Sequence, residues 1–263
     1  MPTFSIITVN LNNAAGLQAT LNSVRIQSFR DYEHIIIDGG STDSSIAEIR
    51  SYEGLFNGAT GGLHWCSQKD NGVYEAMNRG VQQAKGHYLL MLNSGDVLHR
   101  PDSLLQVVNA GLEADIIYGD VEWVTSEGNY IHHFPDRLPF SYFFHNSLGH
   151  QAAFIRREVH DLVGLYCEEY KIVSDWSFFV TAICKHSVSY QHIPVVVADC
   201  PRDGISTDQS NYPIIDAEKE HFLNLTFPAF LDDYQSIKKF RLKKDGKKPL
   251  RRLAQWLLLK TRQ

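Results

Sequence analysis

Short apolar runs that stop abruptly at polar residues recur in the first part of the chain. Three of them share this form: residues 4–9 end at Asn10, residues 34–37 end at Asp38, and residues 87–92 end at Asn93. Runs of this length between polar residues predict buried strands. Because ligands bind outside the carboxyl ends of strands in open α/β sheets, we expect these polar ends to line one shared crevice.

Helical periodicity fills the intervals between these strands. Apolar residues recur at helical spacing over residues 17–24, and residues 44–52 and 73–84 predict two further helices, with a short strand at 63–67. This alternation predicts the α/β class, with a Rossmann-like, mostly parallel central sheet, right-handed crossovers and helices on both faces.

The pattern changes in the second half of the chain. Residues 114–124 predict a strand, and residues 129–134 could pair back onto it across a turn. Residues 174–185 then predict a helix and residues 189–199 another strand. Hairpin pairing of this kind differs from the strand–helix–strand units of the first half.

The change in pattern divides the chain into three segments. We expect residues 1–98 and 99–225 to be two halves of one domain and residues 226–263 to be a separate tail. Charge distinguishes the tail: from residue 238 to the end, eleven Lys or Arg stand against one acidic residue, a balance of +10. The rest of the chain, with 14 basic and 29 acidic side chains, carries −15.

The tail also has an apolar side. Its members are Leu250, Leu253, Ala254, Trp256, Leu257 and Leu258. A basic amphipathic segment with a tryptophan is typical of binding to an anionic membrane surface, and an ordinary solvated helix is the alternative. Nucleic acid is not expected as a partner, because the rest of the chain is acidic and the tail lacks interleaved stacking aromatics.

The composition is that of a folded intracellular protein. Of 263 residues, 43% are hydrophobic, which is enough for one large core. The four cysteines form no C-x-x-C pair, no signal-peptide pattern precedes the first strand, and no run approaches the roughly 18 apolar residues of a membrane span. With the basic tail, these features predict a cytoplasmic protein that is peripheral on the inner face of the cell membrane.

Four motifs occur in order along the first half. They are S-I-I-T-V-N at 5–10, D-G-G-S-T-D at 38–43, K-D-N-G-V-Y-E-A-M-N-R-G at 69–80 and L-N-S-G-D at 92–96. In order and spacing they resemble family 2 glycosyltransferases, most closely the bacterial colanic-acid and O-antigen type. The resemblance implies the GT-A fold, a nucleoside-diphosphate sugar donor, a divalent metal and inversion at the anomeric carbon.

The first two motifs suit a nucleoside. Asp38 offers a carboxylate to a base N–H and Gly39 leaves room for a flat ring, although a plain turn capped by Asp38 would use the same residues. Thr8 and Asn10 leave the neighbouring strand, and we expect them to line the same base and ribose.

The third motif concerns the rest of the donor. In similar enzymes its aspartate lies near the nucleoside and its Asn-Arg pair near the phosphates. The resemblance therefore implies that Asp70 binds the nucleoside and that Arg79 binds the diphosphate, which a guanidinium can meet with paired hydrogen bonds. An ordinary surface position on an amphipathic helix is the alternative for Arg79.

The fourth motif concerns a metal. A Mg²⁺ or Mn²⁺ ion that bridges the diphosphate oxygens stabilises the charge of the leaving group. Asp96 is the expected ligand, with Asn93 and Ser94 beside the donor. The family usually has D-x-D or S-D-D here, and a single carboxylate binds a hard cation weakly, so we expect the metal to arrive mostly with the donor.

Inversion requires a base on the face of the sugar opposite the phosphate, because the acceptor hydroxyl loses its proton as it attacks. Asp175, in V-S-D-W, occupies the segment where similar enzymes place this base. A first-turn aspartate favoured by the helix dipole is the local alternative, and Glu168 and Glu169 are competitors.

Two later segments are candidates for contact with the acceptor or the donor. His150 and Gln151 could hydrogen-bond the acceptor sugar or the donor phosphates, with a structural histidine as an equal alternative. Asp203 and Ser206 belong to a glycine-containing turn that resembles the mobile loop that closes over the donor in such enzymes, with a plain surface turn as an equal alternative.

Together these inferences predict an inverting, metal-dependent glycosyltransferase. Its expected partners are a nucleotide sugar, UDP-linked by default, a lipid-linked glycan acceptor of bacterial surface polysaccharide synthesis, and an anionic membrane. From another class, the alternative is a non-catalytic sugar-nucleotide-binding or scaffold protein on the same fold, because the first acid of the metal motif is missing.

Overall fold

The computed structural model describes residues 1–56, 59–202, 204–234 and 236. By its internal contacts the chain divides into two compact units, Met1–Ile215 and a second that begins at Asp216. The sequence placed the start of a separate tail at residue 226, and the basic part of that tail, from residue 238 onward, lies outside the described residues. None of the described helices is long and apolar enough to cross a membrane.

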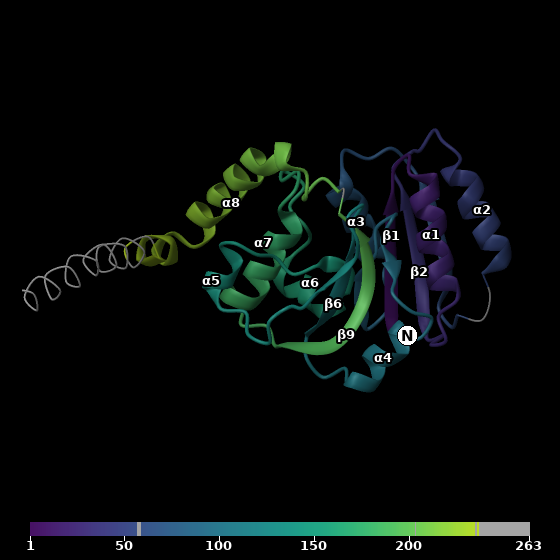
Figure 1. Cartoon of the computed structure of the whole chain (residues 1–263), viewed down its shortest axis with the longest axis horizontal. Helices are drawn as coiled ribbons and strands as arrows, with labels where there is room; N and C mark the ends of the chain where they lie inside the picture. The colour runs from purple at the N-terminus through teal and green to yellow at the C-terminus, as the bar shows by residue number, and fades with distance from the viewer. Residues whose placement is uncertain (57–58, 203, 235, 237–263) are drawn as a thin grey trace, which may run out of the picture. The chain divides into compact units, whose positions relative to one another are not determined.

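Within the described residues, nine strands form one sheet (Figure 1). The strands are β1 (Phe4–Asn10), β2 (Tyr32–Asp38), β3 (Gly62–Ser67), β4 (Tyr88–Met91), β5 (Val97–Leu98), β6 (Ile116–Val124), β7 (Tyr130–His132), β8 (Ala153–Arg156) and β9 (Tyr190–Pro201). Their order across the sheet is β3-β2-β1-β4-β8-β6-β9-β5, and β7 pairs with β6.

The helices lie between these strands along the chain, apart from the last, which follows β9. They are α1 (Ala14–Arg25), α2 (Ser45–Leu55), α3 (Val73–Gln83), α4 (Ser103–Ala110), α5 (Phe140–Phe143), α6 (Arg157–Val163), α7 (Ser174–Val180) and α8 (Tyr212–Thr226), with 3₁₀ turns η1 (His150–Ala152) and η3 (Gln209–Asn211). A π-helical turn, η2 (Thr181–Lys185), follows α7 directly. The helix predicted over 174–185 is therefore one continuous segment with a change of winding.

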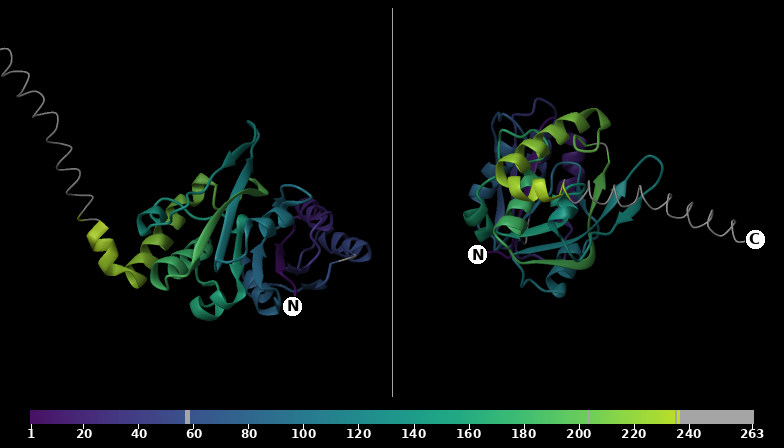
Figure 2. Two further views of the ribbon diagram at one scale, coloured as in Figure 1. Left: turned by 90° about the horizontal axis from the view of Figure 1, so that it is seen from below. Right: turned by 90° about the vertical axis from the view of Figure 1, so that its left-hand side faces the viewer.

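The sheet is parallel in its first half and mixed in its second. β1 pairs in parallel with β2 and β4, and β2 pairs in parallel with β3, as the strand–helix alternation predicts. In the second half, β8 returns antiparallel to both β4 and β6, and β7 forms the expected hairpin with β6. The longest strands, β6 and β9, run side by side in parallel, in teal and green in Figure 2.

Helices cover both faces of β1 and β2, which are buried along their whole length (Figure 1). On one face, Ile36 packs against α1 and α2 in a cluster with Leu17, Leu21, Ile49 and Tyr52. Neighbouring residues of a strand point to opposite faces, so Ile7 and its register partner Ile35 face the other side, where α3 lies. This two-sided cover explains why both strands are continuous apolar runs rather than alternating ones.

Gly80 lets α3 approach β1 closely. A Cβ at Gly80 would overlap Cγ2 of Ile7, and Ile7 is fully buried. We predict that Gly80→Ala lowers the free energy of unfolding by about 1–2 kcal/mol, because overpacking outweighs the gain from removing a helix glycine. Gly54→Ala in α2 is the control, since a Cβ there meets no atom of the described residues within 4 Å. Denaturant unfolding measures both, and a Gly80→Ala protein as stable as Gly54→Ala would contradict the packing argument.

Candidate functional site

A pocket of about 230 Å³ opens at the carboxyl-terminal edge of the parallel strands. The end of β1, the segment that starts α3 and the residues after β4 form its wall. The lining residues are Val9, Asn10, Leu11, Asp70, Gly72, Val73, Ala76, Asn93 and Ser94. Two of the three polar strand ends that were expected to share a crevice, at Asn10 and Asn93, line this pocket together with Asp70 and Ser94, whereas Asp38 is not among the lining residues.

Two amide oxygens in this wall have no hydrogen-bond donor among the described residues. Asn10 is 5% exposed, and its Nδ2 donates to Asp38 Oδ1 at 2.8 Å, which leaves its own Oδ1 unpaired. Asn93 uses Nδ2 toward His150 Nε2 at 3.2 Å, and its Oδ1 is likewise buried and unpaired. A buried acceptor without a donor costs free energy, so both positions suit a ligand with N–H or O–H groups.

Asp38 organises the turn after β2. Its Oδ1 accepts from Asn10 and from the Ser41 hydroxyl at 2.6 Å, and its Oδ2 accepts from the Ser67 hydroxyl at 2.7 Å and from the backbone N–H groups of Gly40 and Ser41. Burial would raise the pKa of Asp38, but the hydrogen bonds from Ser41 and Ser67 outweigh it and hold the pKa below its ordinary value. Both oxygens are thus engaged within the chain, and direct contact with a base stays a prediction.

The space over Gly39 is filled by the Asp70 side chain, where the sequence analysis expected a flat base. A Cβ on Gly39 would lie 2.5 Å from Asp70 Oδ2. Burial raises the pKa of Asp70, whose Oδ1 accepts from the Gly72 N–H at 3.2 Å. Because Gly39 has no side chain, the Asp70 carboxylate can lie against it in the pocket wall.

Arg79 does not line the pocket. Its guanidinium donates to the carbonyl oxygens of Gln68 and Lys69, both at 3.3 Å, and forms an ion pair with Glu75 one turn earlier. Helix geometry explains this, because residues four apart lie on the same face. Arg79 fixes the segment that carries Asp70, which differs from the expected contact with the diphosphate.

Thr8 also lies apart from the pocket. It shares a face with Asn10 but sits two residues below the strand end, where it is fully buried. Its hydroxyl is 3.0 Å from Nε2 of His34, whose Nδ1 contacts the Tyr52 hydroxyl at 2.8 Å. Burial lowers the pKa of His34 to about 3, so this histidine is a neutral core residue. The expectation that Thr8 lines the base does not agree with this position.

Asp96 lies in a buried position between η1 and β9. Burial raises its pKa to about 6, even though the charge of His150 and hydrogen bonds from Cys200 and Gln151 lower it. The Thr20 hydroxyl donates to the Asp96 carbonyl oxygen at 2.7 Å, which anchors the segment to α1. His150 and Gln151 thus hold a carboxylate in this structure, rather than projecting toward open solvent as contacts for a sugar.

His150 joins Asp175 to the pocket wall. Its Nδ1 is 3.1 Å from Asp175 Oδ2, and its Nε2 faces the Asn93 amide. Burial would lower the pKa of His150, but the hydrogen bond to Asp175 and the charges of Asp175 and Asp96 outweigh it and raise the pKa. Tyr74 completes the arrangement, because its hydroxyl lies 3.1 Å from Asp175 Oδ1 and 2.5 Å from the Ile172 carbonyl oxygen.

Asp175 is better placed as a base than its two competitors. Its side chain is 18% exposed, so it is held by neighbours and still accessible. Glu168 and Glu169 are both exposed, and Glu168 accepts a hydrogen bond from Asn78 at 2.8 Å. The choice of Asp175 over the two glutamates stays a prediction, and its contact with His150 is what motivates it.

The oxygen atoms at Asp96 suit a hard divalent cation, although Asp96 is not among the residues that line the pocket. Mg²⁺ and Mn²⁺ favour carboxylate, amide and phosphate oxygens, and Mg²⁺ usually binds one or two carboxylates together with substrate phosphates. Asp96 offers one carboxylate, with the Gln151 amide beside it. This set holds a cation weakly by itself, so the remaining ligands would come from the donor.

The turn after β9, which was expected to resemble a loop that closes over the donor, gives little support for that role. Asp203 lies outside the described residues, and Ser206 is exposed in the turn after β9. Among the described residues, the pocket wall takes no residue from this turn.

Tyr74 and Cys200 are site residues that the sequence analysis missed. Tyr74 stands in the third motif, where its aromatic ring reads as an ordinary apolar position of α3. Its contact with Asp175 spans 101 residues of sequence, and no local pattern encodes such a pair. Cys200 is a lone cysteine at the end of β9 whose pKa is raised by burial and by the neighbouring Asp96.

Comparisons of sequence identify a family and its members. A model of glycosyl transferase family 2 matches residues 5–164. A PGL/p-HBAD biosynthesis glycosyltransferase of Mycobacterium bovis is 35% identical over 201 residues, which are 75% of this chain and 76% of that protein. An uncharacterized glycosyltransferase of Mycobacterium tuberculosis is 43% identical over 110 residues, which are 41% of this chain and 40% of that protein.

Comparisons of structure agree on the fold. Residues 1–349 of S. aureus TarS in complex with UDP-GlcNAc superpose with a TM-score of 0.63 at 17% identity, covering 84% of this chain and 66% of that one. The mannosyltransferase PcManGT from Pyrobaculum calidifontis, in complex with GDP-Man and Mn²⁺, gives 0.57 at 15% identity and covers 75% and 56%. This chain thus spans less than two thirds of either solved chain, and the likeness shows a shared fold, GT-A.

Proposed function

The chain belongs to glycosyl transferase family 2, and we propose on this premise that it moves a sugar from a nucleoside-diphosphate donor to an acceptor hydroxyl, with inversion. The observation that carries the proposal is the pocket at the strand ends, where the buried Oδ1 of Asn10 has no hydrogen-bond donor in the part of the chain that the structure describes. A nucleoside offers N–H and O–H groups to such an oxygen. The candidate metal ligand and the candidate base are both linked to this wall through His150.

The donor is proposed to be UDP-linked, with GDP and dTDP as the other bases to test. TarS was solved with UDP-GlcNAc and PcManGT with GDP-Man, so both bases occur on this fold. In this chain, Asn10 and Asp70 would contact the nucleoside, and Asn93 and Ser94 would lie beside the sugar and phosphates. Asp38 supports them by holding the Asn10 amide in place.

Asp96 would hold the cation, Mn²⁺ or Mg²⁺, together with the diphosphate. When bound, the cation supplies positive charge against the oxygens of the departing nucleoside diphosphate. The chain's own contribution is to place one carboxylate at the strand end, where Gln151 and Cys200 contact it and the Thr20 hydroxyl anchors the Asp96 backbone.

Asp175 would act as the base. The acceptor oxygen forms its bond to the anomeric carbon as the bond from that carbon to the phosphate oxygen breaks. The acceptor proton passes to an oxygen of Asp175, and the bonding pair leaves with the nucleoside diphosphate. His150 and Tyr74 hold the two carboxylate oxygens, which orients the base before the acceptor arrives.

The experiment that tests the proposal is a transfer assay with a panel of sugar nucleotides, with and without Mn²⁺. We expect acceptor-dependent release of nucleoside diphosphate that rises with Mn²⁺. The alternative, a non-catalytic sugar-nucleotide-binding protein, is motivated by the single carboxylate of the N-S-G-D motif. It predicts binding of the nucleotide without any release.

Gly39→Ala should weaken nucleoside-diphosphate binding while changing stability little. The new methyl group meets the flexible end of Asp70, which can rotate away, but rotation removes the carboxylate from the pocket wall. Calorimetric titration with UDP would measure the change, with Gly54→Ala as the matched control outside the pocket. Equal affinities for the two variants would show that Asp70 contributes nothing to the pocket.

The acceptor is proposed to be a lipid-linked glycan at an anionic membrane surface. The +10 balance of residues 238–263 is the motivation, since each basic residue near such a surface is worth about 1 kcal/mol. We predict that deletion of these residues releases the protein from anionic vesicles but preserves transfer to a water-soluble acceptor. Co-sedimentation with anionic vesicles at low salt measures the binding of the intact and the truncated chain. An intact chain that stays in the supernatant would refute the membrane role.

A further inference from the structure

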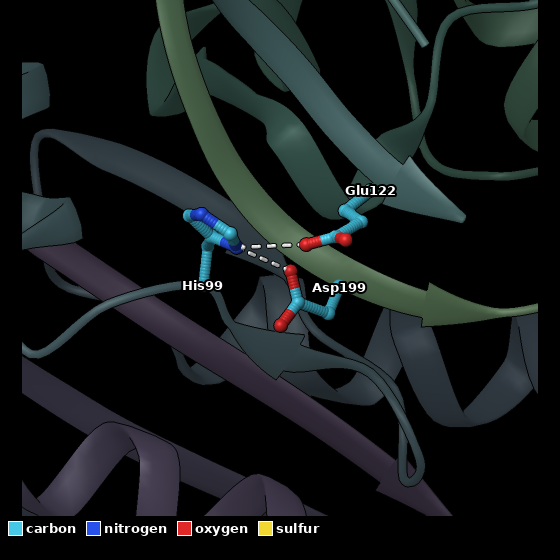
Figure 3. Close-up of side chains that lie close together, drawn as sticks. All are labelled: His99, Glu122 and Asp199. Atoms are coloured by element: carbon cyan, nitrogen blue, oxygen red, sulfur yellow. Dashed lines mark hydrogen bonds and ion pairs between the residues drawn. The ribbon is translucent and has the colours of Figure 1, made fainter. Parts of the chain in front are cut away.

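Three side chains from different parts of the sheet converge (Figure 3), and none of the three lines the pocket. His99 follows β5, Glu122 lies on β6 and Asp199 lies on β9. His99 Nδ1 is 2.6 Å from Asp199 Oδ1 and 3.4 Å from Glu122 Oε2. One possible ligand atom from each residue lies within 4.8 Å of the other two.

The cluster lies on the opposite face of the sheet from Asp96. Asp199 and Cys200 are consecutive strand residues, so their side chains point to opposite faces. Cys200 hydrogen-bonds to the Asp96 carboxylate. Asp199 is in register with Val97 of β5 and Glu122 of β6, and this pairing is regular as far as Pro201.

A positive charge between the two carboxylates, whether from a protonated His99 or from a bound cation, would offset their repulsion. Glu122 and Asp199 are directly opposite on neighbouring strands, and like charges in that position are destabilising. A neutral imidazole can donate one hydrogen bond from Nδ1, which leaves the repulsion in place. A divalent cation bound to Nδ1 and to both carboxylates would offset the repulsion on both sides.

The chemistry of the three ligand atoms indicates which cation the site would prefer. One imidazole nitrogen and two carboxylate oxygens suit Zn²⁺, whereas Mg²⁺ prefers oxygen ligands alone. Zn²⁺ binds such atoms at about 2.0–2.2 Å, so ligand atoms already 2.6 and 3.4 Å apart need only small shifts. The three side chains are 23–25% exposed, which leaves a path for the ion and room for a water ligand.

We propose that His99, Glu122 and Asp199 form a second cation site, selective for Zn²⁺ and independent of the donor metal. The ion would tie β5 to β6 and β9. Because β5 begins directly after Asp96, this tie would also fix the segment that presents the Asp96 carboxylate. The role is structural, and the site does not depend on the proposed sugar transfer.

The test measures Zn²⁺ binding to the full chain after removal of any affinity tag and of bound metal with a chelator. We expect one Zn²⁺ per chain by equilibrium dialysis and elemental analysis, and a Zn²⁺-dependent rise in melting temperature. His99→Ala and Asp199→Asn should each lose at least the roughly tenfold affinity that even an outer-shell partner contributes.

Two controls separate this site from others. Asp96→Asn should retain Zn²⁺ binding, and so should His64→Ala, whose histidine lies 3.9 Å from a single carboxylate, Glu33. Melting curves without metal show whether each variant is folded. If His99→Ala does not fold, Glu122→Gln replaces it as a variant of a ligand residue. Wild-type Zn²⁺ affinity in a folded ligand variant, or absence of Zn²⁺ binding by the wild type, would overturn the proposal.

Discussion

Asp175→Asn is expected to lower turnover by about a hundredfold or more while donor affinity stays close to that of the wild type. The amide keeps the shape of the carboxylate and can still contact His150 and Tyr74, but it cannot take the acceptor proton. Steady-state kinetics with saturating donor, together with a donor titration, separate the two quantities.

Glu168→Gln is the matched control for this variant. It makes the same change from acid to amide on the segment before α7, and it affects one hydrogen bond, with Asn78. We expect its turnover to remain near the wild-type value. If Glu168→Gln lost turnover and Asp175→Asn kept it, the assignment of the base would have to be exchanged.

Asp96→Asn is expected to remove the Mn²⁺ dependence of donor binding. The variant loses the carboxylate that would share the cation with the diphosphate, whereas Asn10 and Asp70, the proposed nucleoside contacts, are unchanged. Asp70→Asn is the contrasting variant, because it should weaken binding equally with and without Mn²⁺. Calorimetric titration of donor at several Mn²⁺ concentrations distinguishes them, and an unchanged metal response in Asp96→Asn would exclude Asp96 as the ligand.

Asp96 should also make the Mn²⁺-dependent affinity for the donor vary with pH. Burial raises the pKa of Asp96 to about 6, and a cation binds the ionised form. As the pH falls through about 6, the carboxylate takes up a proton, so Mn²⁺-dependent affinity should decline. Above that pH the affinity should level off, and in Asp96→Asn this decline should be absent.

The first half of the fold follows from local patterns. Strands 4–9, 34–37 and 87–92 were predictable because both faces are covered and each reads as a short apolar run. The second half was less predictable, since the antiparallel placement of β8 between β4 and β6 depends on contacts between distant residues. The π-helical winding of η2 likewise has no signal in helical periodicity.

The candidate site shows where sequence reasoning stops. The position of Asn10 at the end of its strand correctly identifies it as a pocket residue. Thr8 lies on the same face of the strand two residues earlier, but its side chain is fully buried there. Asp38 reads as a free carboxylate until the structure shows that neighbouring hydroxyl and amide groups use both of its oxygens. The pairing of His150 with Asp175 joins two elements that no spacing rule connects.

Whether the pocket binds a sugar-nucleotide donor is tested by calorimetric titration of the wild-type chain with UDP, GDP, dTDP and their sugar conjugates, with and without Mn²⁺. We expect saturable binding at one site per chain, with one base preferred, and tighter binding of the diphosphate when Mn²⁺ is present. Absence of saturable binding to every nucleoside diphosphate, in a protein that is folded by its melting curve, would contradict the assignment of the pocket to a sugar-nucleotide donor.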